Sequence, residues 1–129
     1  MIKTRKNKIL LVDDDPDITD TFSVGLEDTG LFEVETYNDS VEALSNFKPY
    51  LFDFILLDIK MPKMSGFELC NKMKKLDGNV KVCFISAFDP YSDDELKEEF
   101  RSRRMVECFI PKPIQINELV ERIHVELSR

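Results

Sequence analysis

The chain has 129 residues, a length that suits one domain and is too short for two well-buried cores. Hydrophobic residues make up 43% and charged residues 33%, which is typical of a globular rather than a disordered chain. The formal net charge of −7 argues against direct binding to nucleic acids or anionic membranes, because both require a cationic surface. No apolar run approaches the roughly 20 residues of a membrane span, so we expect a cytoplasmic protein.

The chain begins with basic residues and carries three scattered cysteines. Residues 1–8 are expected to form a basic tail ahead of a single domain over 9–129. Cys70, Cys83 and Cys108 are odd in number, widely spaced and contain no C-x-x-C pair. We therefore expect all three to be reduced and to serve as small apolar residues.

Five short apolar segments predict β-strands. They are Ile9–Val12, Phe32–Tyr37, Phe54–Leu57, Val80–Ile85 and Cys108–Ile110. The first and third are almost unbroken apolar runs, as expected for central parallel strands that are covered on both faces.

Helix signals separate the strands. Asp15-Pro16 predicts an N-cap followed by a first helical turn, and Gly30 predicts the end of that helix. Capping-box patterns start two more helices, at Asp39 and at Ser65. The last two predicted helices cover Asp93–Arg103 and Ile116–Leu127.

Five successive β-α units predict an α/β fold of the flavodoxin-like, doubly wound (βα)5 type. The five-stranded parallel sheet should have the strand order 2-1-3-4-5, with right-handed crossovers and helices on both faces. Such a sheet binds ligands in the crevice beyond the carboxyl ends of its strands, where the strand order reverses. Candidate functional residues should therefore follow strands.

Acidic residues follow the first and third predicted strands. Asp13, Asp14 and Asp15 come directly after the first, and Asp58 directly after the third. Carboxylates that repel each other in a crevice call for a cation, and Mg²⁺ is the small, oxygen-seeking ion that such groups bind. A desolvated Asp58 could also act as a nucleophile on a phosphoryl group. The alternative is that these residues only cap turns and helices, which is the role we expect for Asp15.

Ser86 stands at the end of the fourth predicted strand, and Lys112 follows the fifth. A hydroxyl can donate a hydrogen bond to a phosphoryl oxygen, and an ammonium can compensate its charge. Each residue alone is equally consistent with a turn or a surface position. Their joint occurrence with the acidic residues, on the strands that flank one crevice, favours a phosphoryl site.

Four motifs resemble those of the receiver domain of two-component response regulators, in the family's order and over almost the whole chain. They are Leu11-Val12-Asp13-Asp14-Asp15, Leu57-Asp58-Ile59-Lys60-Met61-Pro62 with Gly66, Ser86-Ala87 and Pro111-Lys112-Pro113. The resemblance implies that Asp58 accepts a phosphoryl group from a sensor histidine kinase or a phosphotransfer protein. It also implies that Asp14 and Asp58 bind Mg²⁺ (or Mn²⁺) directly, Asp13 through a water molecule and Lys60 through its backbone carbonyl.

The resemblance also implies how the phosphoryl group is sensed. Ser86 would be the switch hydroxyl, Lys112 the phosphate-contacting lysine and Phe109 the aromatic residue that turns inward on activation. The Lys112–Pro113 bond is expected to be cis. The signal would leave through the surface of the fourth helix, fifth strand and fifth helix, toward an unknown output protein or a second copy in a homodimer. Such a protein is no enzyme beyond catalysing its own phosphorylation and dephosphorylation.

One segment departs from the family, and two other functions stay open. The chain between Ser86 and Lys112 is longer than in typical members. We expect a longer solvated helix with a basic C-terminal end there, and the alternative is that residues 89–107 form an altered surface for partner recognition. The chain could instead be the receiver portion of a longer DNA-binding transcription regulator. A Mg²⁺-dependent phosphohydrolase is the third possibility, although Lys60 stands where those enzymes usually carry an acid.

Overall fold

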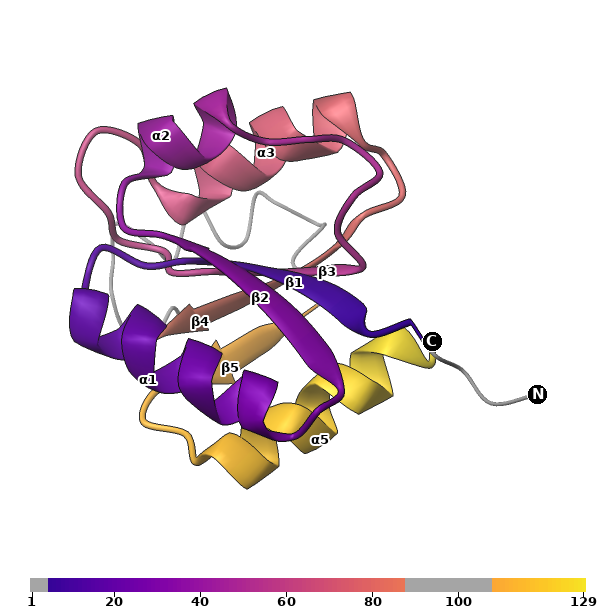
Figure 1. Cartoon of the computed structure of the whole chain (residues 1–129). Helices are drawn as coiled ribbons and strands as arrows, with labels where there is room; N and C mark the ends of the chain where they lie inside the picture. The colour runs from indigo at the N-terminus through magenta and orange to yellow at the C-terminus, as the bar shows by residue number, and fades with distance from the viewer. Residues whose placement is uncertain (1–4, 88–107) are drawn as a thin grey trace.

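A parallel five-stranded sheet forms the centre of the molecule, in the order β2-β1-β3-β4-β5 (Figure 1). The computed structural model describes residues 5–87 and 108–129. The strands are β1 (Asn7–Val12), β2 (Phe32–Tyr37), β3 (Phe54–Leu57), β4 (Lys81–Ser86) and β5 (Phe109–Pro111). The predicted fold class and strand order are confirmed. β1 begins two residues before the predicted strand, because Asn7 and Lys8 pair with Phe32 and Glu33 of β2.

Helices cover both faces of the sheet. They are α1 (Pro16–Asp28), α2 (Ser40–Ser45), α3 (Gly66–Leu76) and α5 (Ile116–Leu127). Figure 1 shows α2 and α3 on one face and α1 and α5 on the other. The predicted helix Asp93–Arg103 and the longer segment 89–107 lie outside the described residues. Within the described part of the chain, no helix is long and apolar enough to cross a membrane.

The helix starts follow the predicted capping residues. Asp15 accepts a hydrogen bond from the backbone N–H of Asp17 at the start of α1. Asp39 caps α2 and Ser65 caps α3 in the same way. Gly30 follows α1 with a φ of 76°, in the left-handed region that favours glycine. These local side-chain contacts therefore fix where three of the helices begin.

Two apolar layers form the core, one on each face of the sheet. Alternate residues of β1 enter different layers: Ile9 and Leu11 pack toward α1 and α5, and Leu10 and Val12 toward α2 and α3. All four are fully buried. This two-sided burial explains why the central strands are continuous apolar runs rather than alternating ones.

Cys83 and Cys108 form a disulfide between β4 and the residue that precedes β5. The expectation that all three cysteines are reduced is therefore wrong for these two, whereas Cys70 is a buried thiol outside the disulfide, as expected. Their Cα atoms lie 4.6 Å apart although 25 positions separate them in the chain. The pairing depends on the register of two parallel strands, which the cysteine spacing alone does not reveal.

The register of the strands brings their carboxyl ends to one edge of the sheet. Val12 of β1 lies beside Leu57 of β3, and Ser86 of β4 lies beside Pro111 of β5. The residues that follow these positions therefore leave the sheet at the same edge. This is the geometry that the predicted crevice requires.

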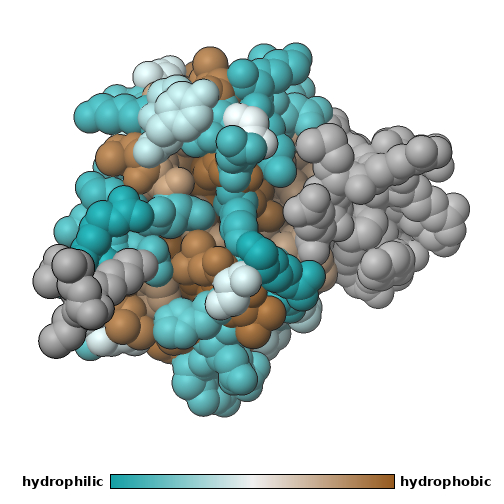
Figure 2. All heavy atoms as spheres, turned by 90° about the vertical axis from the view of Figure 1, so that its right-hand side faces the viewer, coloured by the Kyte–Doolittle hydropathy of each residue, from teal (hydrophilic) through white to brown (hydrophobic). Residues whose placement is uncertain are grey.

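The opposite edge of the sheet, which faces the viewer in Figure 2, mixes apolar and polar side chains. A hollow of about 660 Å³ is lined there by residues that include Tyr50, Asp77, Lys81 and His124. None of the predicted site residues lines this hollow. It is therefore separate from the crevice that the sequence predicts.

Asp77→Ala is expected to lower the free energy of unfolding by about 2 kcal/mol. The carboxylate of Asp77 is buried and accepts hydrogen bonds from the backbone N–H groups of Tyr50, at 2.9 Å, and Asn79, at 3.4 Å. Tyr50 has a φ of 66°, a left-handed conformation that is unfavourable for a residue other than glycine. The hydrogen bond from its N–H to Asp77 helps to hold the turn in this conformation. Urea unfolding measures the loss. Asp20→Ala, at an exposed position of α1, is the control, and an equal loss there would contradict the prediction.

Candidate functional site

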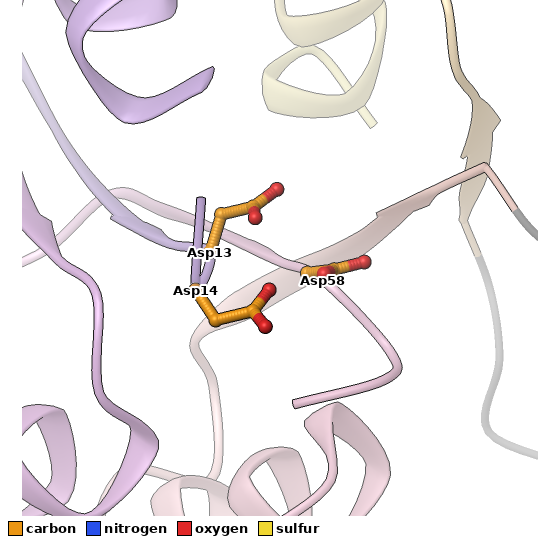
Figure 3. A group of neighbouring side chains, drawn as sticks. All are labelled: Asp13, Asp14 and Asp58. Carbon is orange, nitrogen blue, oxygen red and sulfur yellow. The ribbon is translucent and has the colours of Figure 1, made fainter. Parts of the chain in front are cut away.

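Three carboxylates converge at the carboxyl edge of the sheet (Figure 3). Asp13 and Asp14 follow β1, and Asp58 follows β3, which is hydrogen-bonded to β1. Asp13 and Asp58 are 1% and 7% exposed, and Asp14 is exposed. Each residue offers one carboxylate oxygen, and these oxygens lie within 4.8 Å of one another. The structure thus brings together the three acidic residues predicted for the metal site.

Asp13 is held in place through both its side chain and its backbone. Its carboxylate accepts a hydrogen bond from the backbone N–H of Asp15 at 3.0 Å and contacts Lys112 Nζ at 2.6 Å. The backbone carbonyl of Asp13 accepts from the amide of Asn38 at 2.8 Å, and that amide also donates to Thr19 Oγ1 at 2.9 Å. The supporting role of Asn38 was missed in the sequence, because a polar residue after an edge strand carries no chemical signal of its own.

Asp58 lies in an environment that disfavours its charge. The pKa of its carboxyl group is raised from 3.8 to about 7, chiefly by burial and also by the neighbouring charges of Asp13 and Asp14. Lys112 Nζ, 3.8 Å away, and the backbone N–H of Ile59, 2.9 Å away, partly oppose this rise. A substantial share of Asp58 is therefore protonated at neutral pH in the metal-free protein. A cation beside it would favour the ionised form.

Gly66 fixes the loop that leaves Asp58. Its backbone N–H donates to the carbonyl of Ile59 at 2.8 Å. A Cβ atom at position 66 would overlap the carbonyl oxygen of Asp58. Only glycine therefore allows the start of α3 to pack this closely against the backbone of Asp58.

The remaining predicted residues lie on or beside β4 and β5. Ser86 ends β4, is buried, and accepts at its backbone carbonyl a hydrogen bond of 2.9 Å from the backbone N–H of Lys112. Phe109 is half-buried in β5 and packs against the core layer that contains Phe67 and Phe84. The Lys112–Pro113 bond is cis, as the resemblance implied. The switch roles of Ser86 and Phe109 and the metal role of the Lys60 carbonyl stay predictions.

The chemistry of the site suits a hard divalent cation. Three carboxylates converge, and the ammonium of Lys112 lies 2.6 Å from Asp13 and 3.8 Å from Asp58. If all ionise, two negative charges remain uncompensated. Oxygen donors of this kind are the preferred protein ligands of Mg²⁺, which typically retains several water molecules. The residues present therefore fit the predicted ion.

Lys112→Met is expected to strengthen Mg²⁺ binding about tenfold. The Lys112 ammonium lies 2.6 Å from Asp13, so it competes with an incoming cation for the same negative charge. Calorimetric titration of the metal-free protein with MgCl₂ at pH 8 measures the change. Lys81→Met, which removes a lysine at the opposite edge of the sheet, should leave the affinity unaltered. Weaker binding to Lys112→Met would contradict the prediction.

Comparisons with known proteins agree with this geometry. The family model of the response regulator receiver domain matches residues 9–124. The chain is 37% identical over 123 residues to a CpxR homolog of Haemophilus influenzae, a transcriptional regulatory protein. This match covers 95% of the chain and 51% of that protein. The chain thus spans about half the length of that relative.

Solved structures give the same result. A CheY-like receiver domain protein from Methanospirillum hungatei JF-1 is similar, with 30% identity and a TM-score of 0.79, over 96% of this chain and 95% of that one. A BeF3-activated DrrB receiver domain is similar with 25% identity and a TM-score of 0.80. That match covers 97% of this chain and all of the other.

Proposed function

This chain belongs to the response regulator receiver family of two-component systems, and on that premise we propose that Asp58 is its phosphoacceptor. The donor is the phosphohistidine of a sensor histidine kinase or of a phosphotransfer protein. One observation carries the proposal: a buried carboxylate at a strand end lies among two further carboxylates and 3.8 Å from a lysine ammonium. This is the charge arrangement that phosphoryl transfer to a carboxylate requires.

Asp13, Asp14 and Asp58, with the backbone carbonyl of Lys60, would hold Mg²⁺ or Mn²⁺. The convergence of the three carboxylates supports this assignment. The bound ion would supply electrostatic stabilisation of the negative charge that gathers around the phosphoryl group. Asp13, already hydrogen-bonded to Asp15 and Lys112, would act through a water molecule rather than directly.

The protein's own groups perform the transfer. A carboxylate oxygen of Asp58 attacks the phosphorus, and the bond between phosphorus and the histidine nitrogen breaks. The Lys112 ammonium compensates charge on the phosphoryl oxygens, and the Ser86 hydroxyl donates a hydrogen bond to one of them. The movement of Ser86 toward the phosphoryl group leaves space that Phe109 fills. The chain thus catalyses only its own phosphorylation and dephosphorylation.

The signal would leave toward an output protein through a surface that includes β5 and α5, and the predicted fourth helix of that surface lies outside the described residues. The BeF3-activated form described for the similar DrrB receiver domain supports a switch of this kind. A cytoplasmic location and a homodimer through the same surface stay expectations from the sequence. A second candidate is a receiver portion of a longer DNA-binding transcription regulator. The CpxR homolog favours it, because this chain aligns with only 51% of that regulator.

Intact mass spectrometry with a small phosphodonor tests the proposal. Incubation of the chain with Mg²⁺ and acetyl phosphate is expected to add one phosphoryl group and then to stop. Digestion should locate the group on the peptide that contains Asp58, and EDTA should prevent the reaction. Continued turnover of an external phosphate ester would instead indicate a phosphohydrolase. A protein that stays unmodified would contradict the proposal.

A further inference from the structure

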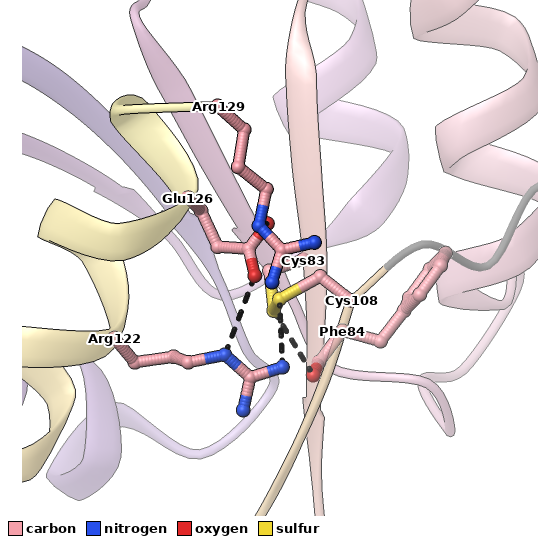
Figure 4. The surroundings of a disulfide bond; sticks show 6 residues. All are labelled: Cys83, Phe84, Cys108, Arg122, Glu126 and Arg129. Carbon is pink, nitrogen blue, oxygen red and sulfur yellow. Dashed lines mark hydrogen bonds and ion pairs between the residues drawn. A yellow bond between two sulfur atoms is a disulfide. The ribbon is translucent and has the colours of Figure 1, made fainter.

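We propose that Cys83 and Cys108 form a reversible redox site that controls how firmly β5 is attached to the sheet. The disulfide joins β4 to the residue directly before β5 (Figure 4). It lies apart from the carboxylates, on the side of the sheet covered by α5. Its reaction partners are small thiols and dithiols, which reduce it, and small disulfides, which form it again.

The attachment of β5 is otherwise slight. β5 has three residues and lies at the edge of the sheet, so it pairs with β4 alone. The ladder consists of three residue pairs, extended by a hydrogen bond of 3.0 Å from the backbone N–H of Phe84 to the carbonyl of Cys108 and one of 2.9 Å from the backbone N–H of Lys112 to the carbonyl of Ser86. The disulfide is a covalent cross-link from Cys83 of β4 to the residue directly before β5. Loss of the disulfide therefore removes one of a small number of bonds that hold β5 against β4.

A cation beside one sulfur marks the disulfide as a reactive one. Arg122 Nη2 of α5 lies 3.5 Å from Cys108 Sγ. The guanidinium is oriented by Glu126, whose carboxylate lies 3.4 Å from Arg122 Nε and 3.7 Å from Arg129 Nε. Glu126 is buried, so this orientation is well defined. A positive charge next to a sulfur stabilises the thiolate and makes it a better leaving group in disulfide exchange.

The exchange proceeds in two balanced steps. A thiolate of the dithiol attacks Cys83 Sγ, the Cys83–Cys108 bond breaks, and its electron pair remains on Cys108 as a thiolate beside Arg122. The second thiolate of the reductant then displaces Cys83, so both cysteines are reduced and the dithiol becomes a cyclic disulfide. A disulfide oxidant such as oxidised glutathione reverses these steps. Because Cys83 and Cys108 are 0% and 3% exposed, the reagent reaches them only when β5 separates from β4.

The redox state should reach the phosphoryl site, and this part of the inference rests on the proposed function. Lys112 follows Cys108 by four positions, directly after β5, and contacts Asp13 at 2.6 Å. In the oxidised protein the disulfide helps to hold Lys112 in that position. In the reduced protein β5 is less constrained, so phosphorylation should be slower.

Thiol counting tests the redox site without any phosphodonor. The whole chain is equilibrated with mixtures of reduced and oxidised glutathione and denatured in acid. Its free thiols are then alkylated, and intact mass spectrometry counts the alkyl groups. We expect one alkylated cysteine, Cys70, in the oxidised protein and three in the reduced protein. Cys83 and Cys108 should become alkylated together, because they share one disulfide. In Cys70→Ser the counts should be none and two. A count that stays constant across all mixtures would overturn the inference.

Paired arginine variants test the reactive sulfur. Arg122→Gln should slow reduction by dithiothreitol about fivefold, because the Cys108 thiolate loses its neighbouring cation. Arg129→Gln is the matched control, because it also removes a partner of Glu126, whereas the recorded contact with a sulfur within residues 5–87 and 108–129 is made by Arg122. Equal rates in the two variants would show that the disulfide is an ordinary structural one.

Phosphorylation of the wild-type chain in its two redox states tests the coupling. The initial rate with acetyl phosphate and Mg²⁺ should be about threefold lower in the reduced protein. Equal rates would refute the coupling and leave the proposed function intact. If neither form accepts a phosphoryl group, the proposed function fails, and the thiol count still decides whether the redox site exists.

Discussion

Asp58→Asn is expected to abolish the phosphate adduct that the wild-type chain forms with acetyl phosphate and Mg²⁺. A neutral amide is a poor nucleophile toward phosphorus, and the substitution also removes one of the three carboxylates that converge at the site. Intact mass spectrometry compares the two proteins under the same conditions. Asp20→Asn, at an exposed position of α1, should be labelled like the wild type. An adduct on Asp58→Asn would contradict the assignment of the phosphoacceptor.

The same substitution should stabilise the metal-free protein at alkaline pH, by up to about 4 kcal/mol at pH 8. The folded protein raises the pKa of Asp58 to about 7, chiefly through burial, so it binds this proton more tightly than the unfolded chain does. The contribution of Asp58 to stability is therefore fully present below about pH 4 and is lost as the pH rises through 7. Asparagine stays neutral at every pH, so the variant does not lose this contribution to the free energy of unfolding as the pH rises.

Urea unfolding between pH 4 and pH 8, with EDTA present, measures the effect. The difference in unfolding free energy between Asp58→Asn and the wild type should grow across this range. Mg²⁺ should then stabilise the wild type more than the variant at pH 8, because the ion favours the ionised carboxylate. Parallel pH curves for the two proteins would show that the charge of Asp58 does not destabilise the fold.

Gly66→Ala should lower the free energy of unfolding by about 3 kcal/mol or more and should prevent Mg²⁺ binding. The new Cβ would overlap the carbonyl oxygen of Asp58 and would lie 2.9 Å from its carbonyl carbon and 3.1 Å from Ile59 Cα. All three atoms belong to the backbone, so no side-chain rotation can relieve the overlap. The loop must move, and Asp58 moves with it.

Gly78→Ala is the matched control for this prediction. A Cβ at that position would meet only the carbonyl oxygen of Lys74, at 3.9 Å, which is an ordinary contact. Its stability should stay within about 1 kcal/mol of the wild type, and its Mg²⁺ affinity should be unaltered. A Gly66→Ala protein that unfolds and binds Mg²⁺ like the Gly78→Ala control would refute the structural role of Gly66.

Local signals in the sequence predicted most of the fold. The strand Phe54–Leu57 and the helix Ile116–Leu127 were predicted with the bounds that the structure shows, because an apolar run and a helical periodicity are properties of the segment itself. β1 begins two residues before its prediction, and β4 and β5 are each shifted by one residue at both ends. Their limits depend on which residues the neighbouring strand can pair with, and local sequence does not contain that information.

The candidate site was predictable because its chemistry is tied to the ends of parallel strands. Once Asp13, Asp58 and Lys112 are assigned to strand ends, the topology alone brings them to one edge of the sheet. The sequence by itself thus predicted that these acidic residues and their basic partner converge, and the Mg²⁺ that they should bind stays a prediction. What it could not determine are contacts that depend on register and packing across layers: the support of Asp13 by Asn38, the pKa of Asp58, and the disulfide. The Asn38 contact and the disulfide join residues that are far apart in the chain, and the pKa of Asp58 depends on burial by such residues. Only the tertiary structure therefore decides these three features.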